Sequence, residues 1–332
     1  MRSSIGSVTA SRARITASQA SLRTTDLIGL GIGPDELSGP RWRNPFRGVH
    51  TPAVGDPAAT AQRILDVVEL IPAGGALSGW AAAHLLGASE LDGRGRSGRA
   101  REDVLITVPR GCHLSRRVGV RYVRSRLEDD DVVEVGGIVV TGPVRTTFDL
   151  ARASTVENGL VAADRLCRQL GLSPARVLIY VEQHPRFRGV PVARAVLELA
   201  DPRSRSGGES RLRYLWVVVA GLPRPQCNPY VVDAEGTVVA MADLLDDGCG
   251  LAGEYDGSTH RELGEHTADN VREEDLEGLG LVVVRATSLD LGRFRSRTVA
   301  RILQGHERAT ATTSRSWGWR PSPLRPPNPR KW

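Results

Sequence analysis

Residues 237–257 read TVVAMADLLDDGCGLAGEYDG, and this stretch decides the fold of the C-terminal third of the chain. Two apolar runs flank the turn-forming string Asp246-Asp247-Gly248. Such a string between apolar runs is typical of a β-hairpin. The stretch therefore predicts one strand over 237–245, a tight turn, and a second strand over 250–256.

The hairpin carries an unusual density of acidic residues. Strand side chains alternate between faces, so Glu254 and Asp256 are expected to point the same way. If the two turn residues are Asp247-Gly248, Asp243 lies opposite Ala252 and diagonal to Glu254. Diagonal neighbours are roughly 7–8 Å apart at their Cα atoms, a spacing at which two carboxylates can share one hard cation such as Mg²⁺.

A helix expected over 208–220 directs a third carboxylate at this sheet. Glu209 shares one helical face with three apolar residues: Leu212, Trp216 and Val219. A carboxylate aimed into an apolar interface costs several kcal/mol unless it is paired, protonated or bound to a metal. His260, six residues after Glu254, adds an imidazole whose ordinary pKa of about 6.5 suits proton transfer.

The elements around the hairpin describe a compact α/β domain of about a hundred residues. Their order is helix, three strands, helix, strand and helix, at 208–220, 226–233, 237–245, 250–256, 269–279, 281–286 and 289–304. Asp269 and Arg272 lie one helical turn apart on the first of the later helices, a spacing that also suits a structural ion pair.

The upstream chain contains two further regions. Residues 22–56 predict two short helices and then a basic ribbon around Arg47-Gly48, which together suggest a degenerate winged helix. Asp56-Pro57 is a typical helix start. Residues 57–200 predict an α+β middle domain with short strands at 103–108, 119–123, 132–135 and 138–140, then helices near 143–152, 155–170, 173–182 and 190–200.

The remaining segments read as tails and a linker. Residues 1–21 and the basic, Pro-rich residues 305–332 are expected to be disordered, and residues 201–208 (DPRSRSGG) to be a linker. The C-terminal domain is thus expected over 209–304. The formal net charge of +6 belongs to the two ends of the chain, since residues 26–305 sum to −3. Basic tails of this kind add salt-sensitive affinity for nucleic acid or remain solvated.

Composition excludes several classes of protein. No apolar run reaches the ~20 residues that a membrane helix needs. The four cysteines, Cys112, Cys167, Cys227 and Cys249, are widely spaced, so the sequence predicts neither a zinc site nor a disulfide framework. A reducing, cytoplasmic location follows. Lys331 is the only lysine among 44 basic residues, so no mechanism that needs a lysine in the folded body is available.

The C-terminal domain resembles a known family. Its pattern is Glu209, Gln226, Asp243, Glu254-Tyr-Asp-Gly, His260, Asp269-x-x-Arg272, Leu276, Gly280 and Arg285. The pattern is similar to that of the domain related to very-short-patch repair endonucleases, which belong to the PD-(D/E)XK, restriction-endonuclease-like superfamily. The resemblance implies a mixed four-stranded sheet flanked by helices over roughly residues 205–304.

The resemblance also implies roles for individual residues. Asp243 and Glu254 match the metal-binding pair, Glu209 the acidic residue of the first helix, and His260 the catalytic histidine. The superfamily's lysine falls at Asp256, so base chemistry passes to His260 or to water on a bound Mg²⁺ or Mn²⁺. Arg272 or Arg285 is then a candidate phosphate ligand.

A looser resemblance concerns the N-terminal regions. The strings Gly39-Pro-Arg-Trp-Arg43, Ser78-Gly-Trp-Ala-Ala82 and Pro143-Val-Arg-Thr-Thr-Phe-Asp149 are similar to type IV abortive-infection antitoxins. Three functions stay open at this point. They are a metal-dependent DNA endonuclease of defence or repair, an antitoxin-type DNA-binding regulator with an inactive nuclease-like domain, and a partner-binding protein. DNA, a cognate toxin or a second copy of the chain are the expected partners.

Overall fold

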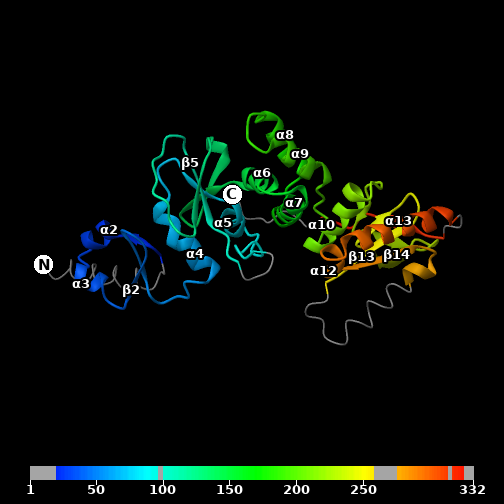
Figure 1. The fold of residues 1–332 in the computed structure, drawn as a ribbon, viewed down its shortest axis with the longest axis horizontal. Coiled ribbons are helices and arrows are strands. Elements are labelled where there is room, and N and C mark those ends of the chain that lie inside the picture. Colours follow the sequence, from blue (N-terminus) through cyan, green and yellow to red (C-terminus); the bar gives the residue numbers. More distant parts are fainter. Residues whose placement is uncertain (1–19, 96–99, 258–274, 313–315, 325–332) are drawn as a thin grey trace. The chain divides into compact units, whose positions relative to one another are not determined.

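The computed structural model describes residues 20–95, 100–257, 275–312 and 316–324. Helices and several sheets follow one another along the chain, so the mixed α/β class expected from the sequence is confirmed (Figure 1). The chain divides into two compact units, Met1–Thr146 and Thr147–Arg330. None of the helices in the described ranges combines the length and the apolar composition needed to cross a membrane.

The first unit begins with a small antiparallel sheet of order β1-β3-β2. The ribbon predicted around Arg47-Gly48 is confirmed as the β2–β3 hairpin, in which Phe46 pairs with Val49 and Gly48 has a positive φ of 79°. Four apolar residues form the core of this part: Leu27, Ile32, Leu37 and Trp42. The elements are β1 (Leu22–Arg23), α2 (Thr24–Gly29), α3 (Pro34–Leu37), β2 (Trp42–Phe46) and β3 (Val49–Pro52).

A partly buried ion pair joins this small sheet to the next helix. Both terminal nitrogens of Arg43 on β2 contact the Asp66 carboxylate of α4, at 2.6 and 2.5 Å. Asp66 also accepts a bond from the Gln62 amide at 2.9 Å. The helix α4 (Thr60–Val67) starts later than the sequence predicted, because Asp56 instead closes a turn by accepting a bond from the Ala58 N–H.

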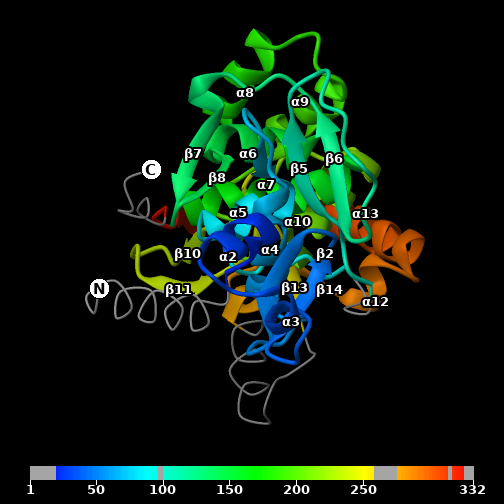
Figure 2. The ribbon, with the colours of Figure 1, turned by 90° about the vertical axis from the view of Figure 1, so that its left-hand side faces the viewer.

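The rest of the first unit is a five-stranded mixed sheet of order β6-β5-β4-β8-β7, with β6 and β7 at its edges (Figure 2). All four predicted strands are confirmed within one residue at each end, whereas β4, which precedes the short helix α5, was missed. That strand has only three residues, so its alternation is too short to read. The elements are β4 (Ala76–Ser78), α5 (Gly79–Leu85), β5 (Val104–Val108), β6 (Val120–Arg124), β7 (Val132–Val135) and β8 (Ile138–Thr141).

The second unit opens with a group of helices that the sequence assigned to the middle domain. The boundary between the units falls inside α6, so α7, α8 and α9 belong with the C-terminal sheet rather than with the upstream one. Gly159 on α7 has no space for a side chain, because a Cβ there would overlap the Ala151 carbonyl of α6. The helices are α6 (Pro143–Ala151), α7 (Val156–Leu170), α8 (Pro174–Gln183) and α9 (Val190–Leu199).

The C-terminal part contains a mixed four-stranded sheet of order β14-β13-β12-β9. The pair β13/β14 is parallel, and β12 pairs antiparallel with both β13 and β9. A second, antiparallel sheet has the order β11-β10-β15. The strands are β9 (Gln226–Cys227), β10 (Tyr230–Val232), β11 (Val238–Met241), β12 (Leu244–Asp246), β13 (Leu251–Asp256), β14 (Val282–Thr287) and β15 (Gly318–Arg320).

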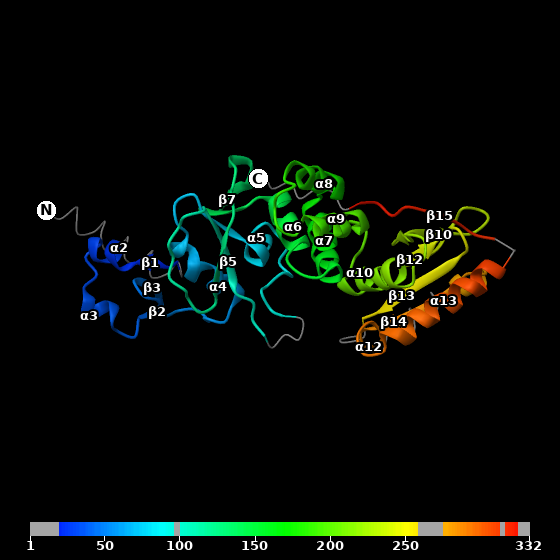
Figure 3. The ribbon, with the colours of Figure 1, turned by 45° about the horizontal axis from the view of Figure 1, so that its top comes forward.

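Each face of the four-stranded sheet buries its own apolar cluster. One face packs against α10 (Gly207–Tyr214), the π-helical segment Leu215–Val219 and α13 (Arg295–Ala311), which runs beside β13 and β14 (Figure 3). Trp216, Leu244 and Leu251 belong to this cluster. On the other face Leu245 and Ala252 pack with residues of the second sheet and with Leu276. Side chains of the sheet can therefore be assigned to a face by alternation.

Two expectations about the ends of this domain are wrong. Residues 201–208 are not a free linker, because the Asp201 N–H donates to the Asp164 carboxylate at 2.8 Å and Ser206 caps α10. The C-terminal segment 305–332 is partly ordered, because α13 continues to Ala311 and Trp319 of β15 pairs with Val231. In both segments, buried contacts outweigh a composition typical of loops.

Candidate functional site

Asp243 and Glu254 face each other directly at one end of the hairpin. Leu244 pairs with Gly253 and Leu245 with Ala252, so the same register carried one residue further sets Asp243 opposite Glu254. The Asp243 N–H donates to Glu254 Oε1 at 3.1 Å, and the Tyr255 N–H donates to Asp243 Oδ2 at 2.8 Å. Each carboxylate is thus held by a backbone N–H of the opposite segment.

The diagonal arrangement predicted for this pair is wrong, because the register is shifted by two residues. Four residues, 247–250, connect β12 to β13 instead of two. Asp246 forms this longer turn, because its Oδ1 accepts the Gly248 N–H at 2.9 Å and its carbonyl accepts the Gly250 N–H at 2.8 Å. Gly250 has a φ of +86°, which favours glycine. The change brings the two carboxylates closer than the sequence suggested.

Two further candidates lie on the same face of the sheet as Glu254. Asp256 is two residues further along β13, and Arg285 on the parallel strand β14 is the register partner of Glu254. Alternation puts all three side chains on the face that also carries Ala252. Gln226 shares this face, but it pairs with Leu245 and is therefore two positions away from Asp243 towards the turn.

Glu209 takes a supporting position rather than the predicted place beside the pair. Its side chain is buried, and its Oε2 accepts bonds from the Arg205 N–H and from the Asn228 amide, each at 2.7 Å. In the described parts of the chain, Glu209, Asp243 and Glu254 do not form a group of three ligand atoms within 4.8 Å of one another. The role predicted for Glu209 at the metal site stays a prediction.

Asn228 connects Glu209 to the acidic pair, a link that the sequence did not reveal. Its backbone N–H donates to the Asp243 carbonyl at 2.9 Å, and its side-chain amide also donates to the Arg203 carbonyl at 3.0 Å. The residue is fully buried and has a φ of +49°, a left-handed conformation that asparagine tolerates better than most residues. Glu209 thus helps to position Asp243 through Asn228.

A buried charge network holds α10 in place. Arg213 contacts the Asp164 carboxylate of α7 at 2.5 Å and the Cys227 sulfur of β9 at 2.9 Å. Burial alone would lower the pKa of Arg213, but the Asp164 carboxylate raises it above its ordinary value, so the guanidinium stays charged. Ser210 on α10 adds a hydroxyl bond to Asp164 at 2.6 Å. The helix that carries Glu209 is therefore fixed to both α7 and the sheet.

The N-terminus of α10 also lies against β13. A Cβ at Gly208 would overlap the ring of Tyr255, so only glycine permits this approach. Tyr255 stands between Glu254 and Asp256, and its side chain occupies the opposite face of the sheet from theirs. The contact anchors the strand that carries both acidic residues.

His260, Asp269 and Arg272 lie outside the residues that the structure describes. Their predicted roles, including that of His260 in proton transfer, stay predictions. The residues that can be placed form an acidic pair with an arginine beside it, at the end of β13 where the chain leaves the sheet.

A second group of potential ligands occurs at the other end of β12. Asp246, Cys249 and His306 each offer one ligand atom, and these three atoms all lie within 4.8 Å of one another. The sequence predicted a turn-forming role for Asp246 and, because it has no closely spaced cysteine pair, no zinc site. His306 is 57 residues from Cys249, so no spacing in the sequence could have indicated this group.

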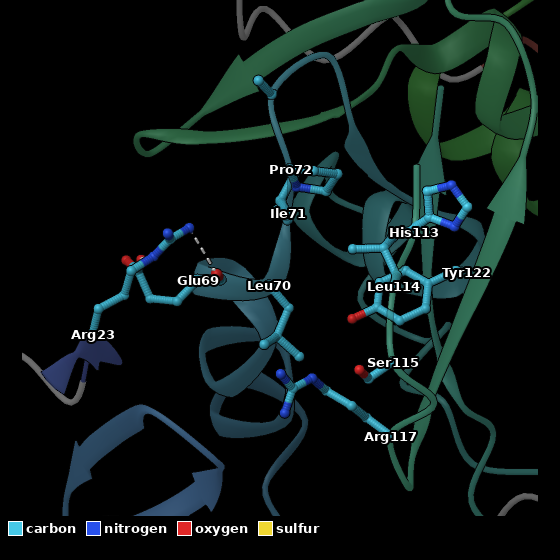
Figure 4. A pocket seen from close by; sticks show the side chains of 11 residues that line it. Arg23, Glu69, Leu70, Ile71, Pro72, His113, Leu114, Ser115, Arg117 and Tyr122 are labelled. Carbon is cyan, nitrogen blue, oxygen red and sulfur yellow. Dashed lines mark hydrogen bonds and ion pairs between the residues drawn. The ribbon is translucent and has the colours of Figure 1, made fainter. Parts of the chain in front are cut away.

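The first unit has an open pocket of about 450 Å³ with a mixed lining. Arg23 and Glu69 lie on one side of it, joined at 3.0 Å, and His113 and Tyr122 lie on the other (Figure 4). The Glu69 carboxylate already compensates the charge of Arg23. The pocket is lined by none of the predicted site residues.

Comparison with known proteins gives two relatives and no family. The uncharacterized protein MT2308 of Mycobacterium tuberculosis (strain CDC 1551 / Oshkosh) is 28% identical over 200 residues, which cover 60% of this chain and 69% of the relative. The uncharacterized protein Rv2248 of strain ATCC 25618 / H37Rv matches with the same figures. No family model matches the chain, and no solved structure matches it significantly. The chain is therefore similar to bacterial proteins whose names state no activity.

Proposed function

We propose that the C-terminal part of the chain is a restriction-endonuclease-like domain that hydrolyses phosphodiester bonds in DNA with the help of Mg²⁺ or Mn²⁺. The observation that carries the proposal is the reciprocal bonding of Asp243, which directly precedes β12, and Glu254 on β13: Glu254 Oε1 accepts the Asp243 N–H, and Asp243 Oδ2 accepts the Tyr255 N–H. The order of the mixed four-stranded sheet and its helical cover agree with that fold. The sequence resemblance described above supplies the reaction class.

The acidic pair fits a hard divalent cation. Mg²⁺ prefers carboxylate oxygens and usually takes one or two carboxylates from the protein. The backbone bonds involve Oδ2 of Asp243 and Oε1 of Glu254, and they fix both side chains before any ligand arrives. When bound, the ion supplies Lewis-acid stabilisation of the phosphoryl charge.

The neighbouring residues have distinct roles in this proposal. Arg285, in register with Glu254, contacts a phosphate oxygen of the DNA as a charged donor. Glu209 acts as a positioning residue, because its Oε2 holds Asn228 and Asn228 holds the Asp243 carbonyl. Asp256 occupies the position of the superfamily's lysine. In this proposal His260 therefore replaces that lysine as the base that accepts the proton of the attacking water.

A plasmid-nicking assay tests the proposal. Full-length protein with Mg²⁺ or Mn²⁺ is expected to nick supercoiled DNA. Asp243→Asn and Glu254→Gln should each reduce the rate by at least about 100-fold, since a lost metal contact costs several kcal/mol. Glu277→Gln removes an exposed carboxylate of the same unit and is the matched control, with unchanged rate. No nicking by any protein, or equal nicking by all four, would remove the nuclease proposal.

A second candidate function is DNA binding without cleavage, and the N-terminal hairpin favours it. The β2–β3 hairpin bears the exposed Arg41 and Arg47 near its two ends, in the manner of a basic wing. The preceding helix α3 carries the exposed acids Asp35 and Glu36, so it is unsuited to entering a DNA groove. In a gel shift at low salt, Arg41→Gln/Arg47→Gln should then bind more weakly than wild type, and Asp243→Asn should bind equally well. Equal binding by the double variant and wild type would reject this second candidate.

A further inference from the structure

The turn between β12 and β13 and the helix α13 bring together three side chains of different chemistry. Asp246 ends β12, Cys249 lies in the turn, and His306 projects from α13. Alternation puts Asp246 on the face of the sheet that α13 covers, because it follows two residues after Leu244. His306 Nε2 is 3.9 Å from Asp246 Oδ2.

The packing of α13 fixes the position of His306. At the preceding residue, Gly305, a Cβ would lie 2.8 Å from the Val284 side chain and 2.9 Å from that of Leu251. The helix therefore approaches the sheet as closely as its backbone allows at this point. On the turn, a Cβ at Gly250 would lie 2.8 Å from the Trp317 ring, so the turn is enclosed as well.

An unsatisfied oxygen points to a ligand at this site. Asp246 is 5% exposed, and its Oδ1 accepts the Gly248 N–H. Its Oδ2 is buried and has no hydrogen-bond partner among the residues that the structure describes. Leaving a carboxylate oxygen buried without a partner is costly, and such oxygens are normally paired or bound to a metal. His306 Nε2 lies 3.9 Å from this oxygen, and one ligand atom each from Asp246, His306 and Cys249 lie within 4.8 Å of one another.

We propose that Asp246, Cys249 and His306 bind one Zn²⁺ ion, which clamps α13 to the β12–β13 turn. Oxygen, sulfur and nitrogen donors from Asp, Cys and His are the set that zinc takes in proteins, and a thiolate disfavours Mg²⁺ and Ca²⁺. The carboxylate, the thiolate and a neutral imidazole carry two negative charges, which one Zn²⁺ balances. This site is separate from the acidic pair and does not depend on nuclease activity.

The distances require only small side-chain movements. Zinc bonds of 2.0 to 2.3 Å imply ligand atoms roughly 3.3–3.8 Å apart at a tetrahedral centre. The three atoms already lie within 4.8 Å of one another on a backbone held by packing. The half-buried Cys249 and His306 leave one side of the group near the surface, and a water molecule completes the coordination there.

Protection of Cys249 from alkylation tests the proposal in the wild-type protein. Metal-free full-length protein is treated with iodoacetamide, with and without one equivalent of Zn²⁺, and each cysteine peptide is quantified by mass spectrometry. Zinc is expected to slow the modification of Cys249 at least tenfold and to leave Cys112 of the first unit unchanged. Equal modification of Cys249 with and without zinc would overturn the proposal.

Variants with intact far-UV circular dichroism extend the test to the other ligands. Wild type should retain one zinc per chain after dialysis, and His306→Gln and Asp246→Asn should retain none. His113→Gln, an exposed histidine next to Cys112, is the matched control and should keep the zinc. A hundredfold excess of zinc over its Kd should raise the thermal midpoint of wild type by roughly 5–10 °C. Full zinc binding by His306→Gln would show that the metal binds elsewhere.

Discussion

The two ends of β12 differ in how their residues are brought together. At the start of the strand, Asp243 and Glu254 meet across one hairpin and are eleven residues apart in the sequence. At its end, Asp246 and Cys249 meet His306, which comes from the last helix. The first arrangement follows from local pairing, so it can be read from a pattern. The second exists only because α13 packs on the sheet, so no pattern in the sequence predicts it.

The largest expected difference between the two ends is in thiol reactivity. Cys227 lies at the acidic end, paired with Leu244, and burial raises its pKa to about 12. Cys249 at the turn end is only half-buried. In metal-free protein at pH 8, Cys249 should react with a disulfide reagent at least about a thousandfold faster, since Cys227 must wait for local unfolding.

Peptide mapping after timed labelling measures these rates. Cys112 should behave like Cys249, and Cys167 like Cys227, because burial raises the pKa of Cys167 too. All four thiols should react at one rate in urea, which is the control. Rapid labelling of Cys227 in the native protein would show that the acidic end is not closed by α10.

The next prediction compares the loss of unfolding free energy when a charged group is removed at each end. Arg213→Met leaves the Asp164 carboxylate buried without its cation and should cost about 3–5 kcal/mol of unfolding free energy. His306→Gln at the turn end, without zinc, removes a long and partly exposed contact and should cost less than about 1 kcal/mol. Urea unfolding followed by circular dichroism measures both.

A double variant provides the control for this comparison. Arg213→Met/Asp164→Leu removes both buried charges and should recover most of the loss, since apolar residues replace such pairs with little cost. Equal destabilisation by Arg213→Met and His306→Gln would mean that the network does not hold α10.

A smaller loss of stability is expected from the left-handed backbone conformation of Asn228. Asn228→Ala loses the amide bonds to Glu209 and Arg203 and forces alanine into a φ of +49°, so it should cost about 2–3 kcal/mol. Asn228→Gly loses the same bonds but adopts that φ freely, and it should be about 1 kcal/mol more stable than the alanine variant. Thermal and urea unfolding of the two proteins side by side give the difference. Equal stability would mean that the left-handed conformation carries no strain.

The smallest effect concerns Asp290, which follows β14 beyond the acidic end. Burial alone would raise the pKa of Asp290, but bonds from the Thr287 N–H and hydroxyl and the charge of Arg301 outweigh burial and lower it. A lowered pKa stabilises the folded state at pH values above the ordinary pKa of 3.8. This stabilisation is lost as the pH falls through the pKa of the folded state.

Asp290→Asn should therefore cost about 1 kcal/mol at pH 7 and become indistinguishable from wild type at the lowest pH at which both still fold. Unfolding curves collected from pH 7 down to pH 3 show the convergence. A gap that stays constant over this range would assign the loss to packing rather than to the charge.

The sequence predicted much of the local structure. The helices α6 to α9 and the strands β5 to β8, β13 and β14 fall within one or two residues of their predicted bounds, since periodicity and turn residues are local signals. The acidic pair was also found, although its register was not. The turn is two residues longer than predicted, and the Asp246 side chain stabilises it by accepting the Gly248 N–H. This hydrogen bond cannot be predicted from the string DDG alone.

The sequence by itself determined the mixed α/β class, the hairpin and the proximity of Asp243 to Glu254, because pairing of neighbouring strands depends on alternation and turns. Only the tertiary structure decided that Glu209 supports Asn228, that residues 201–208 pack against α7, and that His306 faces Asp246 and Cys249. Each of these depends on which distant surfaces bury apolar area together. Which surfaces pack together depends on how closely their shapes fit, as where Gly208 contacts Tyr255 and Gly305 contacts Val284. Spacing along the chain does not specify this fit.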